Sequence, residues 1–198
     1  GENLYNSKYE VLDTLKYKAN WESKYINLSD SIMLWFSFRT DYSYSGNEQK
    51  VYKNTLIKKN GKWDIDPSNS YMPISSGVQY GLTTIEDTTG GGWLVTQVGS
   101  GSFISYHYSK STQHDKVVLT SIPSLQNIRN NTFFNDPFDN PLKVSPSGNL
   151  ISLFSYDAEY LTDNGTLTKQ KYWCHVLNFD KQTGNLSMKE EVFYKEDK

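Results

Sequence analysis

The sequence has very little cysteine: one residue, Cys174, among 198. A single cysteine excludes an intramolecular disulfide and a zinc site built from several thiolates. Cys174 lies between Trp173 and His175 in a strand-like run, where alternation sends the histidine to the opposite face of a sheet. We therefore interpret Cys174 as a small, buried, apolar residue and not as a catalytic nucleophile.

The chain also lacks an excess of basic residues and any long hydrophobic run. It carries 20 Lys and Arg against 22 Asp and Glu, a formal net charge of −2, whereas nucleic-acid binding needs a strongly basic surface. The longest apolar clusters, such as residues 32–36, are far shorter than the roughly 20 residues of a membrane-spanning helix. We therefore expect no nucleic-acid partner and no transmembrane segment.

Helical periodicity is nearly absent. Aromatic residues make up 15% of the sequence and include 15 tyrosines, a composition that favours the pleated surface of a sheet. Clusters of Gly, Asn, Asp, Ser and Pro separate short segments that have the composition of strands. The strands expected in this all-β chain are residues 31–39, 50–58, 63–65, 78–86, 93–98, 102–108, 116–122, 149–156, 171–179 and 186–194.

Several turns between these strands have a specific chemistry. The pair Asn60-Gly61 is typical of a type I′ hairpin, because both residues accept a positive φ. In the Ser-Pro-Ser-Gly segment 145–148, the proline presets φ and the glycine accepts the left-handed conformation. In the next turn, we expect the Asp180 carboxylate to bind backbone amides while Gly184 supplies the left-handed residue.

A weak internal repeat runs through the chain. An aromatic-rich strand, a turn, a second strand and a polar turn recur in residues 31–63, 93–123 and 149–194. Units of this kind bury their faces only by packing on neighbours.

Segments 142–150 and 177–187 together look like one blade of a β-propeller. We predict one repeat-built domain over residues 1–198, a propeller-like stack of antiparallel four-stranded sheets with three to four blade equivalents, either partial or a fragment. A β-sandwich is the alternative.

The segment from about Leu82 to Ser187 resembles the β-propeller domains of surface and secretion-associated proteins of Bacteroidetes. The resemblance rests on a Trp-aliphatic strand at 92–96, an aromatic strand at 103–106, the Ser-Pro-x-Gly turn at 145–148 and a Phe-Asp-x-x-Thr-Gly-x-Leu turn at 179–186. It implies a protein of the cell envelope, periplasmic or at the cell surface. We expect an exported protein, secreted or a lipoprotein, whose signal is not part of this sequence.

Tyrosines that we expect to be exposed provide the strongest lead to a binding site. Tyr42 and Tyr44 lie in a polar run where a core position is not expected, and Tyr71, Tyr106 and Tyr108 extend the set. A tyrosine ring offers apolar area with a polar tip at low entropic cost, which suits protein interfaces and sugar faces. We predict that these five residues bind ligand; ordinary strand-edge positions are the alternative.

No motif requires a reaction, a metal or a cofactor. We expect no metal and no cofactor, and a catalytic activity is the less favoured alternative. His107 and His114 lack the partner residues of a zinc motif. Asp136 and Asp139 lie in an oxygen-rich segment without the Gly and distal Glu of an EF-hand, so calcium binding there is left open. Carboxylates suitable for glycoside hydrolysis in pairs are scattered near strand ends: Asp64, Asp66, Glu86, Asp87, Asp157 and Glu159.

These patterns predict recognition in preference to catalysis. The first hypothesis is a non-catalytic recognition or scaffold module of the bacterial envelope that binds a protein or glycan through its blade loops. The second is a carbohydrate-binding protein of a glycan-uptake system, with tyrosines as stacking platforms. The third is a hydrolase with a carboxylate pair on the propeller face.

Overall fold

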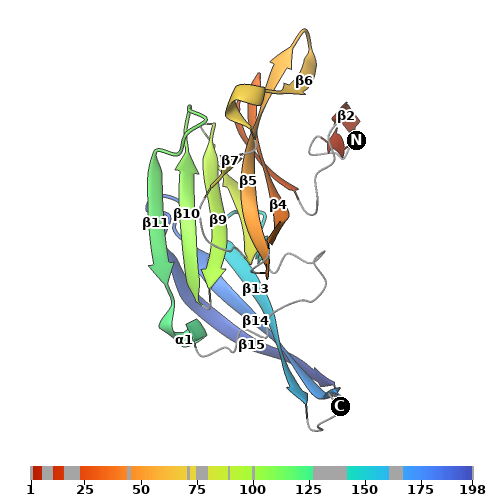
Figure 1. Ribbon diagram of the computed structural model, residues 1–198. Helices are drawn as coiled ribbons and strands as arrows, with labels where there is room; N and C mark the ends of the chain where they lie inside the picture. The colour runs from red at the N-terminus through yellow and green to blue at the C-terminus, as the bar shows by residue number, and fades with distance from the viewer. Residues whose placement is uncertain are drawn as a thin grey trace.

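Strands dominate the protein (Figure 1). The structure is a computed structural model, and it describes residues 2–5, 11–15, 23–43, 46–70, 72–74, 80–88, 90–99, 101–126, 142–160 and 167–197. Within these ranges the helical elements are the short η1 (Pro67–Asn69) and α1 (Pro123–Gln126), and neither they nor any other described helix has the length and hydropathy to cross a membrane. The predicted all-β class is confirmed.

The described residues form three larger sheets, in each of which consecutive strands pair in antiparallel order. The first contains β3 (Ser23–Ser29), β4 (Ile32–Ser43), β5 (Gly46–Lys59) and β6 (Lys62–Ile65), with β7 (Met72–Pro73) paired to β5. The second contains β8 (Gly81–Glu86), β9 (Gly92–Gly99), β10 (Ser102–Tyr108) and β11 (Lys116–Ser121). The third contains β12 (Leu142–Val144), β13 (Leu150–Tyr160), β14 (Leu167–Phe179) and β15 (Leu186–Asp197). A separate pair joins β1 (Glu2–Tyr5) and β2 (Val11–Leu15).

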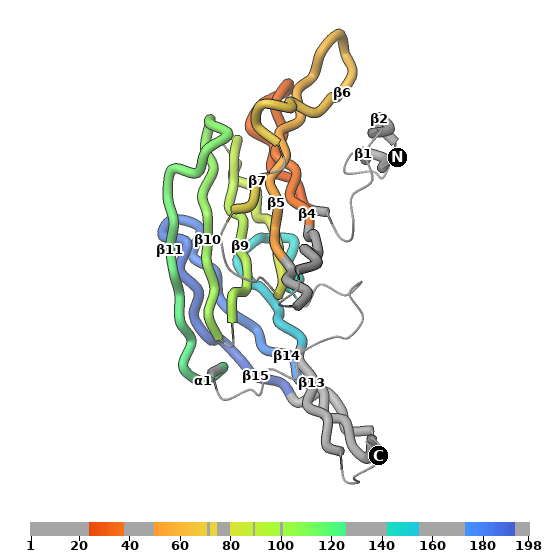
Figure 2. The backbone as a smooth tube through the Cα atoms, in the orientation of Figure 1, coloured from red at the N-terminus to blue at the C-terminus, as the bar shows by residue number. Residues whose placement is uncertain are grey.

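The first strands of the three sheets lie next to one another. β3 contacts β8, and β8 contacts β12. The first strand of each sheet therefore lies beside the first strand of the neighbouring sheet. Figure 2 follows this succession along the chain, from the orange first sheet through the green second sheet to the blue third sheet. The predicted stack of antiparallel four-stranded sheets is confirmed, and three successive sheets replace the two layers of the alternative β-sandwich.

The second sheet is buried on both faces along β8, β9 and β10, whereas its edge strand β11 is mostly exposed. Leu94 and Tyr106 point to one face and share an apolar cluster with Phe36 of the first sheet. Trp93 points to the other face and shares a cluster with Phe179 of the third sheet. Burying an apolar side chain of this size contributes about 1.5–3 kcal/mol, so the second sheet depends on both of its neighbours for its core.

The turns adopt the conformations that their residues predict. Asn60 and Gly61 both have positive φ, 51° and 79°, as a type I′ hairpin requires. Gly148 has a φ of 72°. The Asp180 carboxylate accepts hydrogen bonds from the Thr183 hydroxyl at 2.7 Å and from two backbone amides of its own turn. The predicted turn chemistry is therefore confirmed at all three positions.

The turn between β14 and β15 docks on Trp93. The Trp93 Nε1–H donates to the carbonyl of Lys181 at 2.9 Å. Gly184 has a φ of +80°, and a Cβ added there would lie 2.3 Å from the Trp93 ring. Glycine is therefore required at position 184 for two reasons, its left-handed backbone and the close approach of the indole.

We expect Gly184→Ala to destabilise the protein more than Gly61→Ala. Both glycines have positive φ, but a Cβ at Gly61 meets nothing within 4 Å, so Gly61→Ala loses about 1–2 kcal/mol of unfolding free energy from backbone strain alone. Gly184→Ala adds the collision with Trp93, about 1–3 kcal/mol more. Urea unfolding of both variants measures the difference; equal losses would contradict the docked turn.

Candidate functional site

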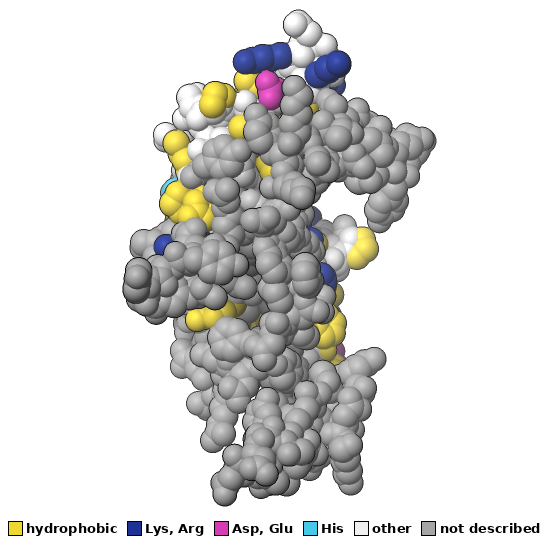
Figure 3. Space-filling model, turned by 45° about the vertical axis from the view of Figure 1, so that its right-hand side comes forward, with side chains coloured by type: hydrophobic (Ala, Val, Ile, Leu, Met, Phe, Trp, Pro, Cys, Tyr) yellow, Lys and Arg dark blue, Asp and Glu magenta, His cyan; other side chains and the backbone are white. Residues whose placement is uncertain are grey.

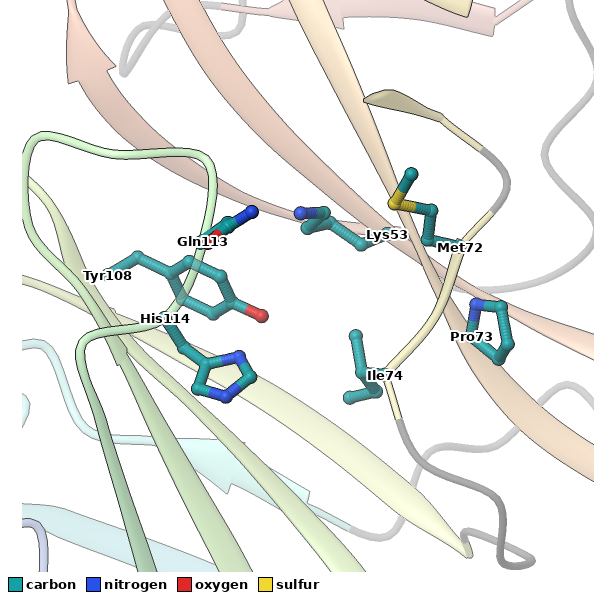
Figure 4. A pocket seen from close by; sticks show the side chains of 7 residues that line it. All are labelled: Lys53, Met72, Pro73, Ile74, Tyr108, Gln113 and His114. Atoms are coloured by element: carbon teal, nitrogen blue, oxygen red, sulfur yellow. The ribbon is translucent and has the colours of Figure 1, made fainter. Parts of the chain in front are cut away.

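A pocket lies where the first and second sheets meet (Figure 4). Its cavity volume is about 240 Å³. That volume is below the roughly 300–1,000 Å³ of sites for drug-sized ligands, so the pocket fits a small molecule or one group that projects from a larger partner. It is lined by Lys53 from β5, by Met72, Pro73 and Ile74 in and after β7, by Tyr108 at the end of β10, and by Gln113 and His114 before β11.

One wall forms because the chain turns back after β6. Asp66 caps η1 by accepting a hydrogen bond from the Ser68 amide at 3.1 Å, and a proline follows at the first helical position, where it is favoured. The chain then pairs with β5, with Met72 opposite Lys53, and the Ile74 amide donates to a β5 carbonyl at 3.0 Å. Backbone hydrogen bonds thus fix the apolar wall beside Lys53.

The opposite wall is built on Tyr108. Its ring lies 5.4 Å from that of Phe36 and meets the His114 ring edge-on, with 6.1 Å between centroids. The His114 ring also lies against Tyr106, at 5.4 Å. Burial raises the pKa of Tyr108, so its phenol stays protonated and able to donate. Figure 4 shows this hydroxyl pointing into the space between the two walls.

Among the described residues that line the pocket, Lys53 carries the ammonium group, and it is only 7% exposed. Its ammonium donates to the carbonyl of Thr112, in the loop between β10 and β11. Burial lowers the pKa of Lys53, and among the residues that the structure describes no carboxylate pairs with it. A cation placed out of water without a counter-ion is costly, so this position is suited to an anionic ligand.

The structure corrects part of the tyrosine prediction. Tyr106 and Tyr108 were expected to be exposed, and this is wrong: they are 4% and 1% exposed, because alternation along β10 points both toward the first sheet. Tyr108 nevertheless lines the pocket, so its predicted binding role stays a prediction. For Tyr42 the structure describes only the backbone, in β4 opposite Asn47, and Tyr44 and Tyr71 lie outside the described residues.

A second polar cluster surrounds His107. Its Nε2 lies 2.9 Å from Asp87 Oδ2 and its Nδ1 lies 2.7 Å from Asp115 Oδ1, and the Ser109 hydroxyl donates to the other oxygen of Asp115 at 2.5 Å. Burial lowers the pKa of His107, but the hydrogen bonds and charges of the two carboxylates outweigh it and raise that pKa above its usual value. These contacts join Asp87, in the loop before β9, to Ser109 and Asp115 at the two ends of the loop before β11. We therefore interpret His107 as a hydrogen-bonded structural residue.

Within the described ranges, no group of three or more His, Cys, Asp and Glu side chains is arranged to hold a metal ion. Asp136 and Asp139, where calcium was left open, lie outside those ranges. The pocket and the His107 cluster are two polar sites that the described structure offers for functional interpretation.

No known protein family and no curated protein matches the sequence. Among solved structures, the chain is similar to the X-ray structure of a hypothetical selenium-binding protein from Sulfolobus tokodaii, with 13% sequence identity and a TM-score of 0.43. The alignment covers 87% of this chain and 41% of that chain. Similarity at this level assigns neither a family nor a ligand, and the resemblance to the Bacteroidetes propeller proteins stays a prediction.

We expect the NMR titration of the histidine rings to separate His107 from His175. The carboxylates of Asp87 and Asp115 hold the pKa of His107 above about 6.5, so Asp115→Asn should lower it. The pKa of His175 should lie below its usual value, because burial lowers that pKa more than the nearby charge of Glu191 raises it.

The same shift has a consequence for stability. Because the folded pKa of His107 is raised, its contribution is fully present below the unfolded pKa of about 6.5 and is lost as the pH rises through the folded pKa. Urea unfolding across this window should show the loss in the wild type and a smaller loss in Asp115→Asn. A His107 midpoint at or below 6.5 would contradict the cluster.

Proposed function

We propose that the protein is a non-catalytic recognition module whose loops bind a partner, and that the pocket between β5, β7 and the loop 109–115 receives one group of that partner. The observation that carries this proposal is the convergence of hydrogen-bonding side chains on an apolar wall. Binding sites commonly combine a mainly apolar lining with a few placed polar groups. Here Lys53, Tyr108 and His114 supply those groups, from two different sheets.

The rim of the pocket supports a partner larger than the cavity itself. Met72 lines the pocket and is 43% exposed, so apolar surface continues from the pocket to the outside. In Figure 3, one small group of hydrophobic side chains (yellow) lies at the upper left beside a histidine (cyan). An exposed apolar surface beside a polar pocket is a feature of interaction sites.

A protein partner is favoured over a glycan. Stacking on a sugar needs an accessible aromatic face, and the rings of Tyr106 and Tyr108 are buried between the first two sheets. The hydrolase hypothesis has less support still, because the two carboxylates that meet at His107, Asp87 and Asp115, each bind that histidine. We further propose action at the bacterial envelope, as a secreted protein or lipoprotein; the sequence resemblance is the support for this location.

Filling the pocket tests the proposal. The wild-type protein is screened against a displayed peptide library and a glycan array, and each binder is then measured with Ile74→Trp, which places a large ring at the apolar wall. We expect affinity to fall by at least about tenfold, equivalent to about 1.4 kcal/mol. His114→Ala, which removes a ring from the opposite wall, provides a second variant in case the tryptophan disturbs folding.

Ser187→Trp serves as the control, because Ser187 is an exposed residue of β15 in the third sheet. The control should retain wild-type affinity. Circular dichroism and thermal unfolding confirm that each variant is folded. Binders that keep their affinity for folded Ile74→Trp and His114→Ala would show that recognition occurs elsewhere.

A further inference from the structure

The Lys53 ammonium is left with unused hydrogen-bonding capacity. It has three N–H donors, and among the described residues its partner is the single carbonyl of Thr112. The strand places this lysine on the inward face: Val51 and Thr55, two residues to either side, are also buried. A lysine in this position is normally paired, so the missing partner is a group that the pocket can receive.

The other groups around the cavity do not neutralise this charge. Tyr108 contributes a neutral hydroxyl, His114 contributes a ring that packs on two tyrosines, and Gln113 contributes an amide. No carboxylate is among the described residues that line the pocket. This lining therefore combines the positive charge of Lys53 with the neutral donors of Tyr108 and Gln113, which is complementary to an anion with oxygen acceptors.

The apolar wall formed by residues 72–74 determines which kind of body the rest of the ligand can have. Met72, Pro73 and Ile74 line the cavity with carbon and sulfur atoms, and Figure 4 shows the Ile74 side chain pointing into the space between the two walls. A strongly hydrated inorganic anion would leave this wall unused, whereas an apolar body would bury it. The volume of about 240 Å³ limits that body to a few carbon atoms.

We propose that this pocket selects a carboxylate carried on a compact apolar body, with Lys53 as the ionic partner, Tyr108 as a hydrogen-bond donor and the segment 72–74 as the apolar wall. This inference rests on the proposed function, since it uses the same pocket, and it adds the chemistry of the group that is recognised. A free short-chain carboxylic acid and the C-terminal carboxylate of a peptide present the same chemistry.

Matched probes test the charge requirement. Isothermal titration calorimetry is performed with 4-methylpentanoate, with the neutral 4-methylpentanamide and with the cationic 4-methylpentylamine, which share one branched apolar body. A second arm uses acetylated tripeptides that end in leucine, as the free acid and as the amide, to distinguish a free acid from a peptide terminus. We expect the acids to bind and the amides and amine to bind at least about tenfold more weakly.

Variants then identify the cation. Lys53→Met keeps the length and apolar stem of the side chain, and Tyr108→Phe keeps the ring while it removes the hydroxyl. Both should weaken binding of the acids, Lys53→Met by at least about tenfold. Lys62→Met, which removes an exposed lysine from β6, is the control and should bind like the wild type.

The outcomes separate this inference from the proposed function. Equal binding of acid and amide, or unchanged binding by Lys53→Met, would overturn the carboxylate inference, while loss of library binders in Ile74→Trp would still support the pocket as a recognition site. Failure of every probe to bind would also overturn the inference. If the library binders are insensitive to pocket filling as well, the proposed function fails with it.

Discussion

The contact between Trp93 and the turn of the third sheet is the interaction on which the described structure depends most. The indole is 1% exposed, donates to the Lys181 carbonyl and leaves no room for a Cβ at Gly184. Its other side meets the His107 ring, with 4.7 Å between centroids. Because His107 is bound by Asp115, the packing of two sheets also fixes the start of β11 and, with it, the loop that forms one wall of the pocket.

Lys53 and His107 show how differently the fold surrounds two basic side chains. His107 lies between two carboxylates that bind both of its ring nitrogens, and its role is to hold loops together. Lys53 is more deeply buried, yet its described partner is one backbone carbonyl. A paired cation stabilises a fold, whereas a buried cation without a counter-ion weakens it. This imbalance is physically reasonable at a site that is completed by a ligand.

Local sequence patterns predicted the strand class and the turns, because turn residues act through their own backbone, as Asn60 and Gly184 show. The strand β3 was not predicted, since Ser23–Ser29 mixes polar and apolar residues without strong aromatic content. The pocket was missed because it joins segments that meet only when two sheets pack. A signal for it existed: strict alternation in β5 places Lys53 on the same face as buried Val51. The same alternation, applied to β10, would have placed Tyr106 in the core.

We propose that the junction of the first two sheets is a binding site in which a bound partner balances the charge of Lys53. The most direct measurement is a crystal structure of the protein grown with 4-methylpentanoate. We expect the carboxylate within hydrogen-bonding distance of Lys53 Nζ and the branched tail against Ile74. A structure in which the acid occupies another site, or in which a carboxylate of the protein itself already pairs with Lys53, would contradict it.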